Sequence, residues 1–285
     1  MRRRNDSRHG TRAPGNRKNR SDCALAIAHI GGMNDSTSVR NRSVSAQGEA
    51  GDADARLGRY DWDAILAKLD ANGSAVIEGL LTPGECRDLI ALYDDENFFR
   101  SRIVMARHGF GSGEYKYFAY PLPALIGDLR GALYARFAPL ANDWNAAMKL
   151  PRRYPDAHEA FLEECHDAGQ ERPTPLLLKY GSGDYNCLHQ DIYGEHLFPI
   201  QVAVLLADPA RGFTGGEFVL TEQRPRMQSR AEVVSLRQGD AVAFAVNDRP
   251  VRGTKGFYRV KMRHGVSRLR SGERQTLGII FHDAT

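Results

Sequence analysis

A series of short apolar or alternating segments in the C-terminal part of the chain constrains the fold most strongly. Gly, Pro, Asp and Asn separate these segments at intervals of roughly 10–15 residues. The segments cover residues 174–180, 184–193, 198–208, 215–223, 231–236, 239–246, 256–267 and 274–283. Many short strands divided by turn residues are typical of a β-sandwich or barrel. The sequence therefore predicts a β-core after Pro173.

The preceding part of the chain has helical patterns instead. Apolar residues at helical spacing follow Trp62, and the pattern stops at Gly73, a typical residue just after a helix end. Thr82, Pro83 and Glu85 form a capping box with proline at the first helical position, which predicts the start of a second helix.

Two further helices are expected, one over residues 123–148 with a break near Pro139 and one over residues 155–169. The predicted fold class is therefore α+β. A double-stranded β-helix, or jelly-roll, core over residues 173–285 carries an N-terminal layer of helices on one sheet, and residues 59–172 are mainly helical support.

Residues 1–58 are rich in Arg, Asn, Ser and Gly without hydrophobic periodicity, which predicts a disordered basic N-terminal extension. Residues 1–50 carry ten Lys/Arg against four Asp/Glu, whereas the other 235 residues carry 29 against 31. Two interpretations stay open: an arm that contacts nucleic acid or an anionic surface, and a solvated extension. Met33 as the true start would make the arm an artefact.

No segment approaches the ~20 consecutive apolar residues of a membrane helix, so no membrane association is expected. Four cysteines, Cys23, Cys86, Cys165 and Cys187, are scattered without the CxxC spacing of a zinc site. Reduced thiols and a cytoplasmic location are the expectation. The sequence does not indicate the oligomeric state.

His189 and Asp191 are the first candidate site residues. Residues two apart in a strand point to the same face, so this imidazole and this carboxylate project together. They form two corners of a metal site of the two-histidine, one-carboxylate type, which holds Fe(II) and leaves open positions. The pair alone is more typical of a polar strand end.

The downstream sequence favours the metal site. His264 ends an alternating run and is the candidate third ligand. Arg274 follows ten residues later, and Thr276 shares its face of the final strand. A guanidinium inside a barrel can hold a carboxylate through two parallel hydrogen bonds, and the hydroxyl adds one more.

This order and spacing resembles the 2-oxoglutarate/Fe(II)-dependent oxygenase superfamily. Residues 215–222 and 236–244, with Gly-Gly-Glu and a Gly-Asp turn, resemble its prolyl-hydroxylase-like branch. More narrowly, three segments resemble a bacterial family of predicted nucleic-acid oxygenases, whose description suggests oxidative repair of alkylated DNA. These segments are residues 179–191, 215–230 and 262–284.

The resemblance implies a dioxygenase in which His189, Asp191 and His264 bind Fe(II). Arg274 and Thr276 would bind the far carboxylate of the co-substrate 2-oxoglutarate, and O2 would take the last open position on the metal. Fe(II), rather than another divalent ion, is itself inferred from the family.

Two tyrosines flank the turn before the HxD motif. The hydroxyl of Tyr180 or Tyr185 is expected to reach the co-substrate, and a packed core tyrosine is the alternative. Glu217 in the Gly-Gly-Glu motif is expected to be structural, with its glycines allowing close backbone approach. Lys255 resembles the co-substrate lysine of prolyl hydroxylases, but Asn247 and Asp248 stand where the paired histidine would be, so Lys255 is predicted to lie on a surface loop.

The other histidines are weaker ligand candidates. His196 has the wrong parity relative to Asp191, and His282 is eight strand residues, roughly 26 Å, from Arg274. Three more histidines, His108, His158 and His166, fall in the predicted helical layer, where structural or exposed positions are expected.

Nucleic acid is the first candidate substrate, single-stranded or damaged. The basic arm, the segment with Arg224, Arg226 and Arg230, and the mixture of aromatics with Arg107 and Lys116 favour it, because cations and stacking aromatics suit unstacked bases. The alternatives are the same chemistry on a protein side chain or small molecule, and a non-enzymatic jelly-roll binding protein. The last alternative requires that the three ligands do not converge.

Overall fold

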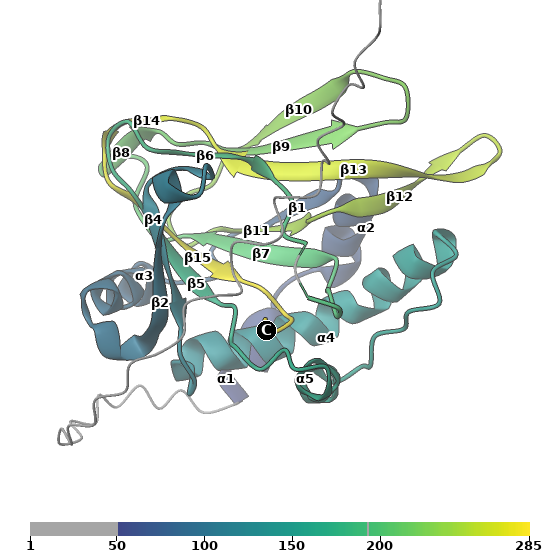
Figure 1. Ribbon diagram of the computed structural model, residues 1–285, viewed down its shortest axis with the longest axis horizontal. Coiled ribbons are helices and arrows are strands. Elements are labelled where there is room, and N and C mark those ends of the chain that lie inside the picture. Colours follow the sequence, from purple (N-terminus) through teal and green to yellow (C-terminus); the bar gives the residue numbers. More distant parts are fainter. Residues whose placement is uncertain (1–50, 193) are drawn as a thin grey trace, which may run out of the picture. The chain divides into compact units, whose positions relative to one another are not determined.

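Two antiparallel sheets face each other, and the helices lie against the outer face of the larger sheet (Figure 1). The computed structural model describes residues 51–192 and 194–285, which all fall in one unit of the chain, Ser36–Thr285. The arm predicted over residues 1–50 lies outside the described residues.

The helices are α1 Gly51–Leu57, α2 Trp62–Asn72, α3 Pro83–Ala91, α4 Ala124–Ala147 and α5 His158–Asp167, with 3-10 turns at Leu92–Asp94, Glu96–Phe98 and Met105–Arg107. The strands before the HxD motif are β1 Ser74–Ile77, β2 Phe99–Val104, β3 Gly111–Ser112, β4 Glu114–Phe118, β5 Leu176–Tyr180 and β6 Tyr185–His189. The later strands are β7 Ile200–Leu205, β8 Phe213–Gly215, β9 Phe218–Gln223, β10 Ser229–Val234, β11 Ala241–Ala245, β12 Asp248–Gly253, β13 Gly256–Val266, β14 Leu269–Gly272 and β15 Arg274–Ile279.

The larger sheet has seven strands in the order β1-β11-β7-β15-β5-β4-β2. The smaller sheet has the order β10-β9-β13-β6-β3, with β12 also paired to β13, and β14 and β8 form a two-stranded ribbon. Apart from the hairpins β9–β10 and β12–β13, most neighbours are distant in sequence, such as β15 between β7 and β5 and β13 between β9 and β6, as in a jelly roll. The predicted α+β class with a double-stranded β-helix core is confirmed.

Strand β7 shows how the larger sheet separates two apolar layers. Its Ile200, Val202 and Val204 belong to the main core with the helices, whereas Ala203 packs with Phe218 of the smaller sheet. Alternate residues of β7 therefore pack against the helices on one face of the sheet and line the space between the two sheets on the other face.

The end of α2 shows why glycine stands at position 73. Gly73 has a φ of 78°, and a Cβ there would lie 2.7 Å from Nε of Arg249. The Arg249 guanidinium donates to the carbonyls of Asp70 and Ala71 at the helix end and pairs with buried Glu222 of β9. Glycine thus ends the helix and leaves room for the arginine that ties it to the smaller sheet.

Helix α3 confirms the capping box. The Thr82 hydroxyl accepts from the Glu85 amide, the Glu85 carboxylate accepts from the Thr82 amide, and Pro83 occupies the first turn. The break predicted near Pro139 is wrong, because α4 runs unbroken from Ala124 to Ala147. Pro139 lies on the exposed side of α4, so water can solvate the carbonyl that loses its partner, and the helix remains anchored by its buried face.

Two boundaries predicted from the sequence need correction. Residues 51–57 form helix α1, whose Leu57 is fully buried, so the extension predicted over residues 1–58 reaches too far. Strands β2 and β4 occupy a region predicted as mainly helical, where they extend the larger sheet beyond β5. The alternation in residues 114–118 is a two-residue period, which the sequence reading missed.

The C-terminal end is held by a buried polar network. Arg130 of α4 pairs with Asp283 at 2.7 Å and donates to the carbonyls of Ile280 and His282. His166 of α5 also contacts Asp283. This network locks the end of β15 to the helical layer, because a buried charge left without its partner is strongly destabilising.

No helix in the described ranges is long and apolar enough to span a membrane.

A pH dependence of stability follows from His158, which is buried and bonded through Nε2 to the Phe281 carbonyl. Burial lowers the pKa of His158 to about 4 from an ordinary 6.5. Between these pH values the unfolded chain binds a proton at His158 that the folded chain does not bind. The contribution of His158 to the free energy of unfolding is therefore complete above pH 6.5 and is lost as the pH falls toward 4. It amounts to about 3 kcal/mol at most.

Urea unfolding of His158→Gln should show a shallower fall in stability between pH 6.5 and 4 than wild type, whereas exposed His108→Gln should match wild type. Parallel curves for wild type and His158→Gln would contradict the prediction.

Candidate active site

The pairing of β6 with β13 brings the two predicted histidines together. His189 ends β6, and His264 is its cross-strand partner on β13, with ring centroids 4.2 Å apart. Asp191 follows in the turn after β6; its Oδ1 lies 3.4 Å from Nε2 of His189, and its Oδ2 lies 3.4 Å from Nε2 of His264. One ligand atom from each residue lies within 4.8 Å of the other two. The three side chains therefore converge.

The charges at this cluster favour an anionic carboxylate between imidazoles. Burial acts to raise the pKa of Asp191, but the two histidines outweigh it and hold that pKa well below its usual range. Burial acts to lower the pKa of His189, yet the Asp191 carboxylate outweighs burial and raises it. Burial, together with the nearby His189, lowers the pKa of His264. These shifts reflect a cluster in which His264 is buried and His189 and Asp191 are partly exposed. It offers one negative charge and an imidazole lone pair.

The orientation of His189 suits a metal ion. Its Nδ1 lies 2.7 Å from the Cys187 carbonyl, and this contact fits a proton on Nδ1 and a free lone pair on Nε2, the atom facing Asp191. Nδ1 of buried His264 has no hydrogen-bond partner among the described residues. Two imidazole nitrogens and one carboxylate on one face are the donor set of a non-haem Fe(II) site, so the residues present fit this metal.

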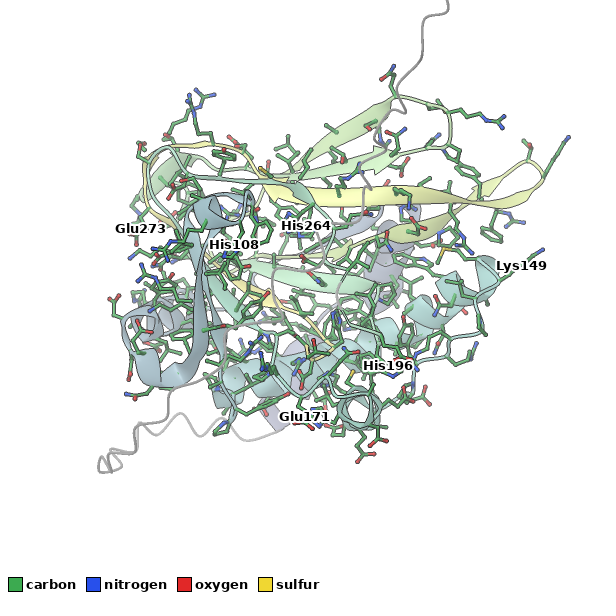
Figure 2. The ribbon with its side chains drawn as sticks, viewed as in Figure 1. His108, Lys149, Glu171, His196, His264 and Glu273 are labelled. Carbon is green, nitrogen blue, oxygen red and sulfur yellow. The ribbon has the colours of Figure 1, made fainter. Side chains whose placement is uncertain are left out.

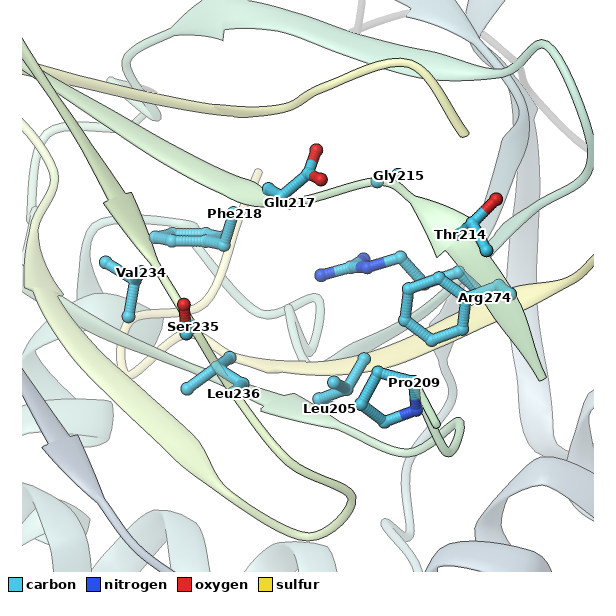
Figure 3. A pocket seen from close by; sticks show the side chains of 12 residues that line it. Leu205, Pro209, Thr214, Gly215, Glu217, Phe218, Val234, Ser235, Leu236 and Arg274 are labelled. Atoms are coloured by element: carbon cyan, nitrogen blue, oxygen red, sulfur yellow. The ribbon is translucent and has the colours of Figure 1, made fainter. Parts of the chain in front are cut away.

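Arg274 lies 2% exposed at the start of β15, beside the cavity drawn in Figure 3. The cavity has a volume of about 340 Å³ and is lined by Leu205, Phe218 and Arg274 among others. Figure 3 shows the guanidinium directed into it. Nη1 of Arg274 donates to the Thr276 hydroxyl at 2.6 Å, so the predicted pair does share a face.

The guanidinium of Arg274 forms no ion pair with any described carboxylate, and burial lowers its pKa. A buried cation without a partner is costly unless an anion enters the cavity. Gly216 of the Gly-Gly-Glu motif makes room for it, because a Cβ at this positive-φ position would lie 3.0 Å from Cδ of Arg274. The close backbone approach expected from the sequence is seen at Gly215, where a Cβ would lie 2.5 Å from the Arg268 carbonyl oxygen.

The two candidate tyrosines have different positions. Tyr180 is fully buried opposite Arg274, and its ring lies 5.7 Å from the guanidinium carbon. Tyr185 is 42% exposed and pairs with Ser112 at the edge of the smaller sheet. A register shift in the β6–β13 pairing places Asn186 on the inner face, where its amide contacts the Tyr180 hydroxyl. The structure brings Tyr180 to Arg274 but not Tyr185, because the bulge reverses the face that strict alternation predicts.

The remaining histidines lie outside this cluster. Figure 2 shows His196 beside α5, apart from His264, and the His196 backbone bonds to Gln170. His282 is fully buried and bonds to the Phe198 amide. His108 is exposed and stacks on Phe110, in a loop rather than in a helical layer.

Lys255 lies exposed in the turn between β12 and β13, as predicted. Glu217 accepts hydrogen bonds at the surface from Ser267, consistent with a structural role.

Sequence reasoning missed several residues around the cluster. Phe218 and Phe244 pack on His264, with ring centroids 6.1 and 4.6 Å away. Both residues end motifs that the sequence made visible, Gly-Gly-Glu-Phe and Gly-Asp-Ala-Val-Ala-Phe. Tyr115 of β4 is close enough to Asp191 that the carboxylate adds to the rise in its pKa, which is due first to burial. Gln190 donates to Asn247 and to the Met262 carbonyl, tying the HxD turn to β13.

Comparison with known proteins gives a family. Residues 113–284 match the family described as an oxygenase catalysing oxidative methylation of damaged DNA. The chain belongs to this oxygenase family. It is a 2-oxoglutarate/Fe(II)-dependent oxygenase, as the resemblance in sequence implied, and the non-enzymatic alternative is excluded because the three candidate ligands converge.

Relatives of this oxygenase include two uncharacterized proteins of Mycobacterium tuberculosis, from strains CDC 1551 and H37Rv. Each is 49% identical over 167 residues, which are 59% of this chain and 72% of the relative. Among solved structures, a prolyl hydroxylase from Trichoplax adhaerens has a TM-score of 0.49 at 14% identity, covering 79% of this chain and 88% of that one. A 2OG-Fe(II) oxygenase family oxidoreductase from Burkholderia pseudomallei has a TM-score of 0.47 at 14% identity, covering 80% and 93%.

Metal binding should stabilise this oxygenase through the cluster. A divalent ion at one hundred times its Kd should add about 2.7 kcal/mol to the free energy of unfolding, because it binds only the folded state. Thermal unfolding without oxygen, with and without Fe(II), should show a rise in Tm for wild type and none for Asp191→Asn or His189→Ala. Asp208→Asn, at a loop carboxylate paired with Arg211, is the matched control and should behave as wild type. An equal rise in Asp191→Asn would show that the metal binds elsewhere.

Proposed function

We propose that this oxygenase removes methyl groups from alkylated nucleic acid by hydroxylating the methyl carbon. In this proposal His189, Asp191 and His264 bind Fe(II), while Arg274, Thr276 and Tyr180 bind 2-oxoglutarate. The observation that carries the proposal is the convergence of three donor atoms within 4.8 Å, beside a cavity that holds a buried guanidinium without an anionic partner.

Fe(II) bound here, with 2-oxoglutarate and O2, supplies the oxidation: the oxo acid becomes succinate and carbon dioxide while one oxygen atom enters a C–H bond of the substrate. Asp191 contributes the one negative charge of the metal site, and the hydrogen bond of His189 to the Cys187 carbonyl fixes the ring. Gln190 holds the turn that carries Asp191. The chain thus supplies a positioned donor set on strand ends.

Arg274 is well suited to the far carboxylate of the oxo acid. Its guanidinium is buried, so the attraction between the two charges is screened less than at the surface. Thr276 occupies one N–H of the guanidinium and fixes its orientation, which leaves other N–H groups for the carboxylate. The Tyr180 ring packs beside it and bounds the space.

The rings of Phe218 and Phe244 cover His264 on the inner side and limit the access of water. A hydroxylated N-methyl group is a hemiaminal, which breaks its C–N bond to release formaldehyde and the unmodified base. The reaction needs no further catalytic group from the protein after the hydroxylation.

The family description supports nucleic acid as the substrate class. The exposed loop with Arg107 and the stacked His108 and Phe110 also supports it, because this loop continues into β3, which pairs with β6. Two cations expected to contribute are engaged elsewhere. Lys116 is buried against Glu96 and the Tyr93 carbonyl, and Arg224 pairs with Glu222.

Turnover tests the proposal directly. Wild type with Fe(II), labelled 2-oxoglutarate and single-stranded oligonucleotides that carry N-methylated bases should release succinate and formaldehyde in equal amounts. His189→Ala should lose at least 100-fold in rate, because the metal site loses a ligand. His196→Ala, a histidine outside the cluster, is the matched control. Iron-dependent succinate release without formaldehyde from any oligonucleotide would confirm the oxygenase chemistry but reject nucleic acid as the substrate.

Removing the buried cation should weaken co-substrate binding selectively. Arg274→Met should raise the KM for 2-oxoglutarate roughly 10- to 100-fold, the loss expected for charge-assisted hydrogen bonds, while the Tm shift with metal persists. Exposed Arg268→Met is the control and should leave this KM unchanged. An unchanged KM in Arg274→Met would contradict the assigned role.

A further inference from the structure

A buried amide without a partner faces the space between the sheets. Gln201 of β7 is 4% exposed, and its Nε2 has no hydrogen-bond partner in the described part of the chain. Ile200 and Val202, on either side of it, belong to the core on the helical face of the sheet. Gln201 therefore points the other way, with Ala203, toward the smaller sheet.

Gln201 lies beside the wall that covers the metal cluster. Its partner on β11 is Phe244, whose ring centroid is 4.6 Å from that of His264. The other residues of this wall are apolar: Ala203, Val242 and Val246. The amide is thus a single polar group in an apolar surface next to a candidate metal ligand.

Gln201 does not line the cavity beside Arg274, and it also lies far from Arg274 along the strands. In the β15–β7 register Thr276 pairs with Leu205 and Gly278 with Ala203, and continuing this register brings Ile280 opposite Gln201. Six strand residues separate Arg274 from Ile280, roughly 20 Å along the strand. An oxo acid held by Arg274 extends toward the metal but does not reach this row, so Gln201 belongs to the substrate's side of the site.

A buried donor without a partner is destabilising, and native proteins rarely retain one without a reason. An apolar side chain of the same size would pack in the same wall without that cost. Substrate recognition accounts for the amide, because a site built to hydrogen-bond a substrate discriminates strongly against analogues that lack the matching group.

We propose that Gln201 donates a hydrogen bond to a carbonyl oxygen of the substrate base beside its methylated nitrogen. The inference rests on the proposed demethylation of nucleic acid and adds a base preference to it. N3 of a pyrimidine lies next to the C2 carbonyl, which accepts a hydrogen bond. N1 of adenine lies between a C–H group and an amino group, and neither of these accepts one. The enzyme should therefore prefer N3-methylpyrimidines to N1-methyladenine.

The experiment compares 3-methylcytosine with 1-methyladenine in otherwise identical single-stranded oligonucleotides. Wild type should favour 3-methylcytosine about tenfold in kcat/KM, the effect of one hydrogen bond. Gln201→Met, which keeps a similar volume, should lose this preference by losing activity on 3-methylcytosine alone. The affinity of the metal-free protein for the two oligonucleotides, measured by fluorescence anisotropy, should show the same change.

Gln275→Met is the matched control. Gln275 is 6% exposed on β15, next to Arg274 in sequence and on the opposite face from Thr276, and its Nε2 donates to Glu273. This variant should keep the base preference. In urea, Gln201→Met should unfold at the same or a higher concentration than wild type, because it removes an unpaired polar group, whereas Gln275→Met should unfold at a lower one.

Two outcomes would overturn the role of Gln201 alone. The first is demethylation of both bases with equal kcat/KM by wild type, or with the wild-type preference by Gln201→Met. The second is a lower urea midpoint for Gln201→Met, which would assign the amide a structural partner. If wild type releases succinate but demethylates neither base, the proposed nucleic-acid function fails first, and the base preference fails with it.

Discussion

The pairing of β6 with β13 is the constraint on which the site depends. His189 and His264 are cross-strand partners, and two side chains in such a pair point to the same face of the sheet. A slip of one residue would turn one imidazole to the outer face and separate it from Asp191. Gln190 stabilises this register, since its side-chain amide donates a hydrogen bond to the carbonyl of Met262, two residues before His264. The candidate metal site therefore depends more on strand registration than on the turn that carries the carboxylate.

The interior has groups that folding alone would not favour. Arg274 is buried without a carboxylate partner, and Nδ1 of His264 and Nε2 of Gln201 lack hydrogen-bond partners among the described residues. Elsewhere buried charges are paired, as in Arg130 with Asp283 and Arg249 with Glu222. Arg249 Nε at the end of α2 also lacks a described partner, but its guanidinium is otherwise paired. The three unpaired groups between the sheets are therefore candidates for function, because functional sites often depart from the rules of stable packing. The paired networks and the helical core offset that cost.

Much of the site could be predicted from residue spacing. Two-residue parity predicted that Arg274 and Thr276 share a face, and they do because β15 is a regular strand. It also predicted that His189 and Asp191 project together, although Asp191 lies in the turn after β6 and not in the strand. Proximity to the turn before the HxD motif did not suffice for Tyr185, since the register shift between β6 and β13 places Asn186 inward instead. Such a bulge depends on the partner strand and leaves no local signal. The helix break predicted near Pro139 was wrong for a related reason, because tertiary packing of α4 on both sides of this residue overrides the local preference for a break. The sequence could not indicate Gln201, because what distinguishes this residue is a buried amide without a hydrogen-bond partner, which only the folded structure shows.

The order of side chains between the sheets separates the two groups that we propose to bind the co-substrate and the substrate. Arg274 and Tyr180 are cross-strand partners in one row of the larger sheet, and Gln201 lies several rows away on β7. The rows between them are largely apolar, with Leu205 beside Thr276 and Ala203 beside Gly278. A low-polarity interval strengthens the attraction of Arg274 for a carboxylate and gives a charged co-substrate no second place to bind. At the far end a neutral amide can select a neutral acceptor without attracting that same anion. In the proposed function, separating the charged donor Arg274 from the neutral donor Gln201 lets each of them select its own molecule independently.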